Sequence, residues 1–286
     1  GRAVSTRRRP PLFPILPEIT ELIGVAQSAP HVSDVWTHTL RTVAYARDIR
    51  NWILGRRVFD ENPAAVAWQA AMEPWRYRLR QHFLQPIAGD HQRIDWLVWH
   101  AMWHDAGKAA TTSQTVEDDG SIRYRFLGHE DISAQLAVRR LSELRFSRTE
   151  WDLTEMVVRT HMRPHHLHDS FNRAPISRRA CYRFFRDTGG HNQGDLAGID
   201  VLMLALADYQ AIFAAPQPPD WHAYLDHVVQ LLAFAFDTNG LASIQQPLVD
   251  GYTVMRHLSL EPGPTVGILL ERIREAQAAG EITSRE

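Results

Sequence analysis

The segment "WHAMWHDAGKAATTSQ" (Trp99–Gln114) places two histidines, an aspartate and a lysine within nine residues, among bulky tryptophans. The lysine, Lys108, is the single lysine of the chain, against thirty arginines. Polar side chains that interrupt an apolar helical pattern cost free energy on burial unless they find partners. The segment therefore predicts either a helix that happens to carry polar residues or one wall of a metal site.

Helical periodicity continues on both sides of this segment. The run "TTSQTVEDDGSIRYRF" differs, because two short alternating stretches flank an Asp-Gly turn and predict a β-hairpin. "SRTE" (147–150) is a capping box that opens the helix after it. The expected helices span 35–54 behind an N-cap at Ser33, 64–83, 91–106, 128–144, 151–162, 176–187, 200–213 and 221–236, with a helix pair over 248–279 around "EPGP".

These elements predict an all-α fold: a helical bundle with one small β-hairpin insert and a short helical C-terminal tail. We expect a lead-in segment over 1–30, a metal-binding domain over 31–240 and the tail over 241–286.

Composition excludes several classes of protein. The 286 residues are 44% hydrophobic, enough for a substantial core, and the formal net charge of -2 argues against a globally basic nucleic-acid binder. The one cysteine, Cys181, forms neither an internal disulfide nor a cysteine-based zinc site, and we expect it to be buried. Because no apolar run approaches eighteen residues and the N-terminus lacks a signal-peptide core, we expect no membrane span and a cytoplasmic protein.

Six histidines and aspartates suited to metal binding lie on five different expected helices. Helical bundles build metal sites by projecting such side chains inward from facing helices. Asp105 has two carboxylate oxygens and is able to bridge two ions, while the adjacent His104 binds one of them. Nitrogen-rich ligation favours manganese, iron, cobalt, nickel or zinc over magnesium, as one or two divalent ions. The six candidate ligands are His38, His104, Asp105, His129, His161 and Asp208.

The order of these residues resembles the HD-domain superfamily of metal-dependent phosphohydrolases. His38, the pair His104-Asp105, and Asp208 match its defining motif. Two further histidines, His129 and His161, match those of members that hold two ions. "HDAGK" (104–108) fits the form His-Asp-x-Gly-Lys, in which the lysine lies near the substrate phosphate. The resemblance implies an HD domain in which Asp105 and Lys108 take part in catalysis.

A closer resemblance, to bacterial tRNA nucleotidyltransferases (the CCA-adding enzyme and poly(A) polymerase family), runs from about residue 12 to the end. Residues 104–147 are similar to their HD segment, and 248–286 to the tail that contributes to tRNA binding. The polymerising head of that family needs a glycine-rich strand-turn and a pair of aspartates, which we do not find before His38. We therefore expect a chain that does not add nucleotides by itself, with a separate head as a candidate partner. The ending "ITSRE" suggests a trimmed tail.

Several histidines compete for the same roles. His100 lies one helical turn before His104, and we expect it to support packing. His161 competes with His165 and His166. We favour His161, because Pro164 is expected to end the helix and leave the later pair on a loop.

Phosphate contacts are expected from Lys108, and from Arg163 and His165 at the substrate entrance. The series Arg173, Arg178, Arg179, Arg183 and Arg186 is either a solvated face or a stripe that follows RNA phosphates. Its RNA-binding candidates are Arg178, Arg179 and Arg183.

The sequence leaves three functions open and favours the first, because all six candidate metal ligands are present. The first is a phosphatase or phosphodiesterase acting on a nucleotide, a 2′,3′-cyclic phosphate or an RNA end. The second is a non-catalytic RNA-binding body of a tRNA nucleotidyltransferase-like protein. A nucleotide-sensing HD protein is a third, less favoured hypothesis. The oligomeric state stays open.

Overall fold

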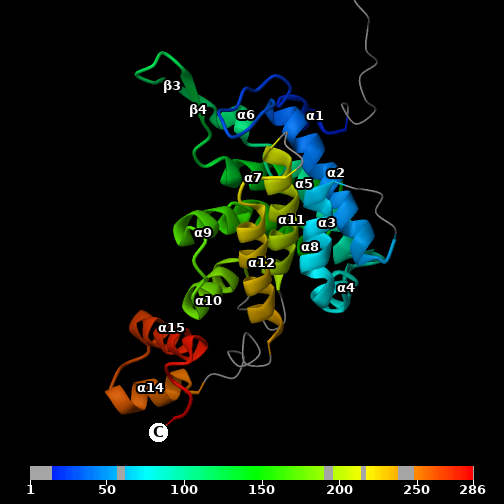
Figure 1. Cartoon of the computed structure of the whole chain (residues 1–286). Coiled ribbons are helices and arrows are strands. Elements are labelled where there is room, and N and C mark those ends of the chain that lie inside the picture. Colours follow the sequence, from blue (N-terminus) through cyan, green and yellow to red (C-terminus); the bar gives the residue numbers. More distant parts are fainter. Residues whose placement is uncertain (1–14, 57–61, 190–195, 214–216, 238–247, 286) are drawn as a thin grey trace, which may run out of the picture.

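The structure, a computed structural model, describes residues 15–56, 62–189, 196–213, 217–237 and 248–285. Helices α2 (Val35–Ile53), α5 (Arg93–Trp103) and α11 (Ala197–Ile212) pack against one another at the centre of a helical bundle (Figure 1). Helices α7 (His129–Glu143) and α8 (Arg148–Thr160) pack together beside them. The predicted all-α fold is confirmed.

Shorter elements complete the bundle. The 3-10 helix η1 spans Glu73–Trp75. The remaining helices are α1 (Pro17–Thr20), α3 (Pro63–Met72), α4 (Arg76–Phe83), α6 (Lys108–Thr111), α9 (Arg163–Phe171), α10 (Arg178–Asp187) and α12 (Trp221–Phe236).

Helix α11 is apolar on nearly every side and runs through the core, as such a helix must. Its two aspartates are both buried, one at each end. Asp200 accepts hydrogen bonds from Arg93 (2.6 Å) and His82 (2.8 Å). Burial raises the pKa of Asp200, but Arg93 and His82 outweigh burial and lower it. This aspartate therefore belongs to the core, whereas Asp208 lies at the other end, in the candidate metal site.

The predicted hairpin is confirmed as β3 (Ser113–Val116) and β4 (Ile122–Arg125), paired from Ser113↔Arg125 to Val116↔Ile122. Gly120 closes its turn at φ 81°, a conformation that favours glycine. A second, unpredicted antiparallel pair joins β1 (Pro86–Ala88) to β2 (His91–Gln92). Because β2 takes the first residues of the expected helix 91–106, α5 begins only at Arg93.

Three local predictions were wrong. Asp34, not Ser33, caps α2, since its Oδ1 accepts the Thr37 N–H at 2.9 Å. The expected helix 64–83 is interrupted by η1, which contains Pro74, a residue without an N–H to donate. Pro164 does not leave a loop behind it: it lies in the first turn of α9, where a proline is well tolerated.

The predicted helix pair of the tail is confirmed as α14 (Gly251–Leu258) and α15 (Pro264–Ala279). Figure 1 shows this tail at the opposite end of the molecule from the β3–β4 hairpin, with α15 packed on α10. The expected domain boundary at 240/241 and residues 1–14 of the lead-in lie outside the described residues. Of the described helices, none combines the length and apolar character needed to cross a bilayer.

Candidate metal centre

The six candidate ligands come together as two groups of three buried side chains. The ligands of one group come from α2, from α11 and from the C-terminal end of α5. Those of the other come from the turn after α5, from the start of α7 and from the end of α8. Within each group the potential ligand atoms all lie within 4.8 Å of one another. The groups are His38, His104 and Asp208, and Asp105, His129 and His161.

Three of the four histidines are oriented in the same way by the backbone. In each, Nδ1 lies at hydrogen-bonding distance from the carbonyl oxygen three residues earlier, which favours the tautomer with the proton on Nδ1. The Nε2 lone pair is then left for a metal, an arrangement typical of metal-binding histidines. The pairs are His104 with Ala101 (2.9 Å), His129 with Phe126 (2.9 Å) and His161 with Val158 (2.7 Å).

The second group contains buried nitrogens without a hydrogen-bond partner. Nε2 of His129 and of His161 have none among the described residues. Both atoms face Oδ1 of Asp105, at 3.3 and 3.9 Å. A buried polar atom left unpaired costs about 1–3 kcal/mol, and a divalent cation would satisfy both lone pairs and the carboxylate. These residues therefore fit a metal ion.

Asp105 lies between the two groups. Its Oδ1 faces His129 and His161, while its Oδ2 lies 3.2 Å from Nε2 of His104 and 3.5 Å from that of His38. A carboxylate that presents one oxygen to each of two ligand sets has the geometry of a bridge between two ions.

The charges of the centre suit a cation. Burial raises the pKa of Asp105 and of Asp208, but the adjacent His104 outweighs burial and holds both well below their ordinary values. Burial lowers the pKa of His104, yet the two carboxylates raise it to about 10. Burial, helped by His129 and His104, holds the pKa of His161 well below its ordinary value. Without a metal the two carboxylates therefore hold a proton on His104, which a cation would replace, whereas the His161 imidazole stays neutral.

Gly107 allows the centre to close. A Cβ at this position would lie 2.3 Å from the carbonyl oxygen of His129 and 2.7 Å from the backbone nitrogen of Ser133. The Gly107 N–H also donates to the Ser133 hydroxyl at 2.8 Å. The N-terminus of α7 therefore rests directly on the "HDAGK" turn, which brings His129 to Asp105.

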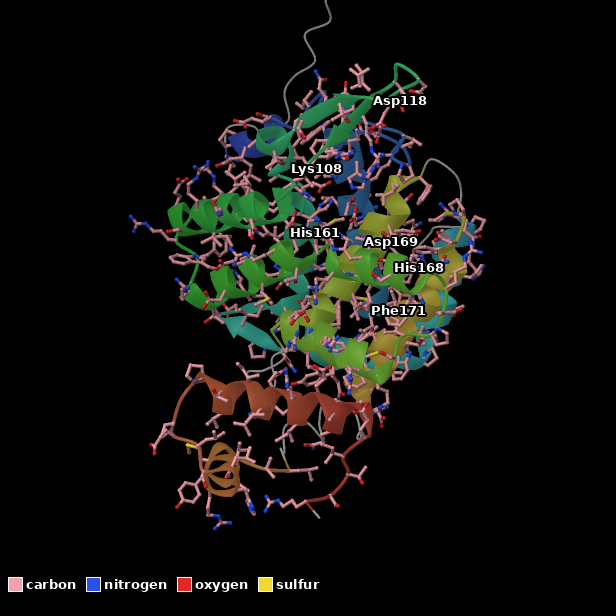
Figure 2. All side chains as sticks on the ribbon, turned by 90° about the vertical axis from the view of Figure 1, so that its left-hand side faces the viewer. Lys108, Asp118, His161, His168, Asp169 and Phe171 are labelled. Carbon is pink, nitrogen blue, oxygen red and sulfur yellow. The ribbon has the colours of Figure 1, made fainter. Side chains whose placement is uncertain are left out.

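Lys108 lies at the edge of this centre, where Figure 2 shows it close to His161 and below the hairpin. Its ammonium is 2.8 Å from Oδ2 of Asp105 and donates to Oε1 of Gln27 at 2.9 Å. The side chain is only 8% exposed. The structure thus places the single lysine directly against the Asp105 carboxylate.

His165 occupies a different position from the one expected. It lies on α9 and is buried, with Nε2 3.0 Å from Oδ2 of Asp208. Its Nδ1 is 3.3 Å from the Tyr224 hydroxyl, and its ring lies beside the Tyr209 and Tyr224 rings, which stack on each other at 4.0 Å between centroids. His165 therefore holds one oxygen of Asp208, Oδ2, while the other oxygen, Oδ1, faces His38. The sequence signal for this helix was Pro164, since proline is common in the first turn of a helix.

We expect His165→Leu to weaken metal binding by about 10- to 100-fold, the usual cost of removing a hydrogen bond that orients a ligand. His166→Leu is the matched control, because His166 is the next residue on α9 and is exposed. Competition with a chelating dye measures the affinity for Mn²⁺ or Ni²⁺. Equal affinities for the two variants would contradict this role of His165.

Two further histidines lie close to the ligands. His31, which the sequence did not single out, packs edge-on against His38 at 5.1 Å between ring centroids. Burial and the charge of Lys108 lower its pKa to about 4. His100 is fully buried, 3.4 Å from the Thr154 hydroxyl, and burial lowers its pKa to about 4. His100 therefore packs within the bundle, in agreement with its expected supporting role.

The remaining predicted residues lie away from the centre. Arg163 pairs with Asp187. The arginines of α10 face the tail: Arg179 pairs with Glu281 at 2.7 Å, and Arg183 pairs with Glu275. The Arg178 Nε donates to the carbonyl oxygen of Ala278. Their assignment to RNA binding stays a prediction.

Comparison with known proteins agrees with the resemblance to tRNA nucleotidyltransferases. No protein-family model matches the chain. It is 28% identical over 271 residues to the CC-adding tRNA nucleotidyltransferase of Thermus thermophilus, covering 95% of this chain and 47% of that protein. It is 30% identical over 188 residues to the A-adding tRNA nucleotidyltransferase of Deinococcus radiodurans, covering 65% of this chain and 38% of that protein. The chain is related to tRNA nucleotidyltransferases. It spans about half the length, or less, of these curated relatives.

Proposed function

We propose that this chain is a metal-dependent phosphohydrolase of the HD type. The observation that carries the proposal is the position of Asp105, which presents one carboxylate oxygen to each of two buried histidine groups. A structural histidine cluster would have no need of a shared carboxylate with separate oxygens for each side. The substrate is a phosphate ester: a nucleotide, a 2′,3′-cyclic phosphate or an RNA end.

Each residue has a defined task in this proposal. His38, His104 and Asp208 would hold one ion, His129 and His161 would hold the other, and Asp105 would serve both. Two such divalent ions supply an activated water and neutralise a phosphoryl oxygen. Lys108, held between Asp105 and Gln27, is positioned to donate hydrogen bonds to the phosphate from the rim of the centre. His165 keeps the Asp208 carboxylate in orientation.

Within this proposal, the names of the relatives favour RNA as the substrate. Both are named for the addition of nucleotides to tRNA. A phosphohydrolase related to them would act on the phosphate of an RNA 3′ end or of a 2′,3′-cyclic end. Removal of that phosphate would leave the free hydroxyl on which nucleotide addition depends.

Removal of metal provides the test. We expect protein stripped with EDTA to hydrolyse none of a panel of mononucleotides, 2′,3′-cyclic phosphates and 3′-phosphorylated RNA. Addition of Mn²⁺ or Ni²⁺ should restore release of phosphate, or opening of the cyclic ester, from at least one substrate. A panel that stays negative with metal bound would reject the proposal.

The match over 95% of the chain also favours a second candidate, a non-catalytic tRNA-binding body. In that case tRNA binding would weaken steeply with salt, because phosphate contacts release counterions. Hydrolysis would remain absent at every metal concentration.

A further inference from the structure

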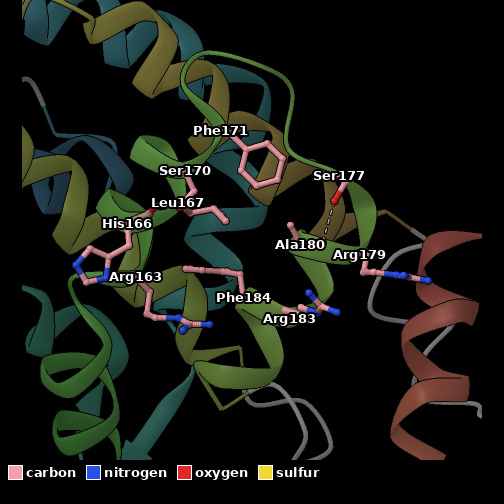
Figure 3. A pocket seen from close by; sticks show the side chains of 10 residues that line it. All are labelled: Arg163, His166, Leu167, Ser170, Phe171, Ser177, Arg179, Ala180, Arg183 and Phe184. Carbon is pink, nitrogen blue, oxygen red and sulfur yellow. Dashed lines mark hydrogen bonds between the residues drawn. The ribbon is translucent and has the colours of Figure 1, made fainter.

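A cavity of 370 Å³ lies between α9 and α10, separate from the metal centre (Figure 3). Figures 1 and 2 place these helices and Phe171 between the metal centre and the tail. The volume lies at the small end of the range for pockets that bind small molecules, about 300–1,000 Å³. Neither the fold nor the proposed hydrolysis accounts for this cavity.

The cavity wall is cationic on its inner side. Arg163, Arg179 and Arg183 line it together with His166, and no acidic residue is among the described residues that line it. Figure 3 shows the guanidinium groups of Arg163 and Arg183 on the same side of the cavity, whereas Arg179 points toward α15. The side chains of Arg163 and Arg183 are 44% and 52% exposed. Arg163 pairs with Asp187 and Arg183 pairs with Glu275, so a phosphate would bind these two guanidinium groups in place of the carboxylates.

Aromatic and apolar side chains from both helices line the rest of the cavity. Phe171 and Leu167 from α9 face Phe184 and Ala180 from α10 across the cavity (Figure 3). Phe171 is half-buried, so part of its ring is open to a ligand. Ser170 and Ser177 also line the cavity; the Ser170 hydroxyl donates to the His166 carbonyl oxygen, and the Ser177 hydroxyl accepts the Ala180 N–H.

From these features we infer that the cavity between α9 and α10 binds one nucleotide unit, with its phosphate on Arg163 and Arg183 and its base against Phe171. The combination selects a nucleotide, because inorganic phosphate leaves the aromatic side unused and an apolar ligand leaves two guanidinium groups unused. The nucleotide is either free or the exposed end of an RNA strand. This inference does not depend on hydrolysis at the metal centre.

The tail holds these arginines in the absence of a ligand. Glu275 of α15 pairs with both Arg179 and Arg183, and Glu281 pairs with Arg179. A carboxylate presents to guanidinium the same oxygen acceptors as a phosphate. The phosphate therefore competes with Glu275 for Arg183, and removal of that carboxylate should strengthen nucleotide binding.

The test is equilibrium binding of AMP and of a short fluorescent RNA to the full chain in excess EDTA, so that no hydrolysis contributes. We expect Arg183→Gln and Phe171→Leu each to weaken binding by about tenfold, the usual effect of losing one charged hydrogen bond or one stacked base. Glu275→Gln should strengthen binding several-fold. Tighter binding of the RNA than of AMP assigns the site to an RNA end, and the reverse order to a free nucleotide.

Two controls match these changes of charge on α8, at residues that do not line the cavity. Arg148→Gln removes an exposed arginine paired with Asp152, and Glu155→Gln removes a glutamate paired with Arg159. Unchanged binding in Arg183→Gln and Phe171→Leu would overturn the inference, and so would equal effects of the controls. Because Glu275→Gln is expected to gain affinity, misfolding cannot account for that result.

Discussion

Asp105→Asn is expected to lose bound divalent metal and to lower phosphohydrolysis by on the order of 10³-fold or more, since metal catalysis contributes several kcal/mol. Asparagine has nearly the same shape but only one oxygen, so it cannot face both histidine groups at once. It also removes one of the two negative charges that attract a cation. Oδ1 of Asp105 faces His129 and Oδ2 faces His104, so both groups lose a ligand.

Metal content per chain, measured by mass spectrometry after dialysis, reports the first effect, and the rate on the responsive substrate reports the second. Asp131→Asn is the control: Asp131 is 59% exposed and pairs with Arg159 on the surface. Circular dichroism checks that the helices remain. A variant that keeps two ions and full activity would show that Asp105 does not bridge them.

Gly107→Ala is expected to destabilise the fold by about 3 kcal/mol, at the upper end of the usual cost of overpacking. The new methyl group would meet the His129 carbonyl oxygen at 2.3 Å and the Ser133 nitrogen at 2.7 Å, and neither backbone atom can rotate away. The start of α7 has to shift, which moves His129 from Asp105. We therefore expect the variant to lose metal affinity as well as stability.

Gly267→Ala is the control, and we expect it to change the free energy of unfolding in the opposite direction. Gly267 lies within α15, and a Cβ there meets no atom within 4 Å. Alanine in an open helical position should stabilise the protein by about 0.5–1 kcal/mol. Urea titrations of the two variants, with and without Mn²⁺, measure both effects. Equal stabilities of Gly107→Ala and the unmodified chain would mean that α7 does not rest on the turn.

Local signals in the sequence predicted much of the fold. The capping box at Ser147 forms as expected, with its hydroxyl accepting the Glu150 N–H. The Asp-Gly turn closes the β3–β4 hairpin, and α12 has the predicted bounds. These features depend on residues within a few positions of one another. Pro164 was expected to end a helix but lies in the first turn of α9, because a proline either ends or begins a helix according to how the flanking chain packs.

The arginines of α10 illustrate what local patterns cannot decide. Their spacing is compatible with a solvated face, an RNA-binding stripe or a packed interface. In the structure, Arg179 and Arg183 face Glu275 and Glu281 of the tail, about a hundred residues later in the chain. Only the folded arrangement of α10 and α15 brings these charges together.

The sequence by itself determined the residue types at the candidate centre, because histidines and aspartates in apolar helices need partners when they are buried. Only the tertiary structure decided which atoms lie close together. It places one oxygen of Asp105 near each histidine group and His165 beside Asp208, and it packs the start of α7 directly on Gly107. The physical reason is range. Helix and turn preferences act over a few residues, whereas the centre depends on five elements separated by up to 170 positions, held together by the packing of the whole core.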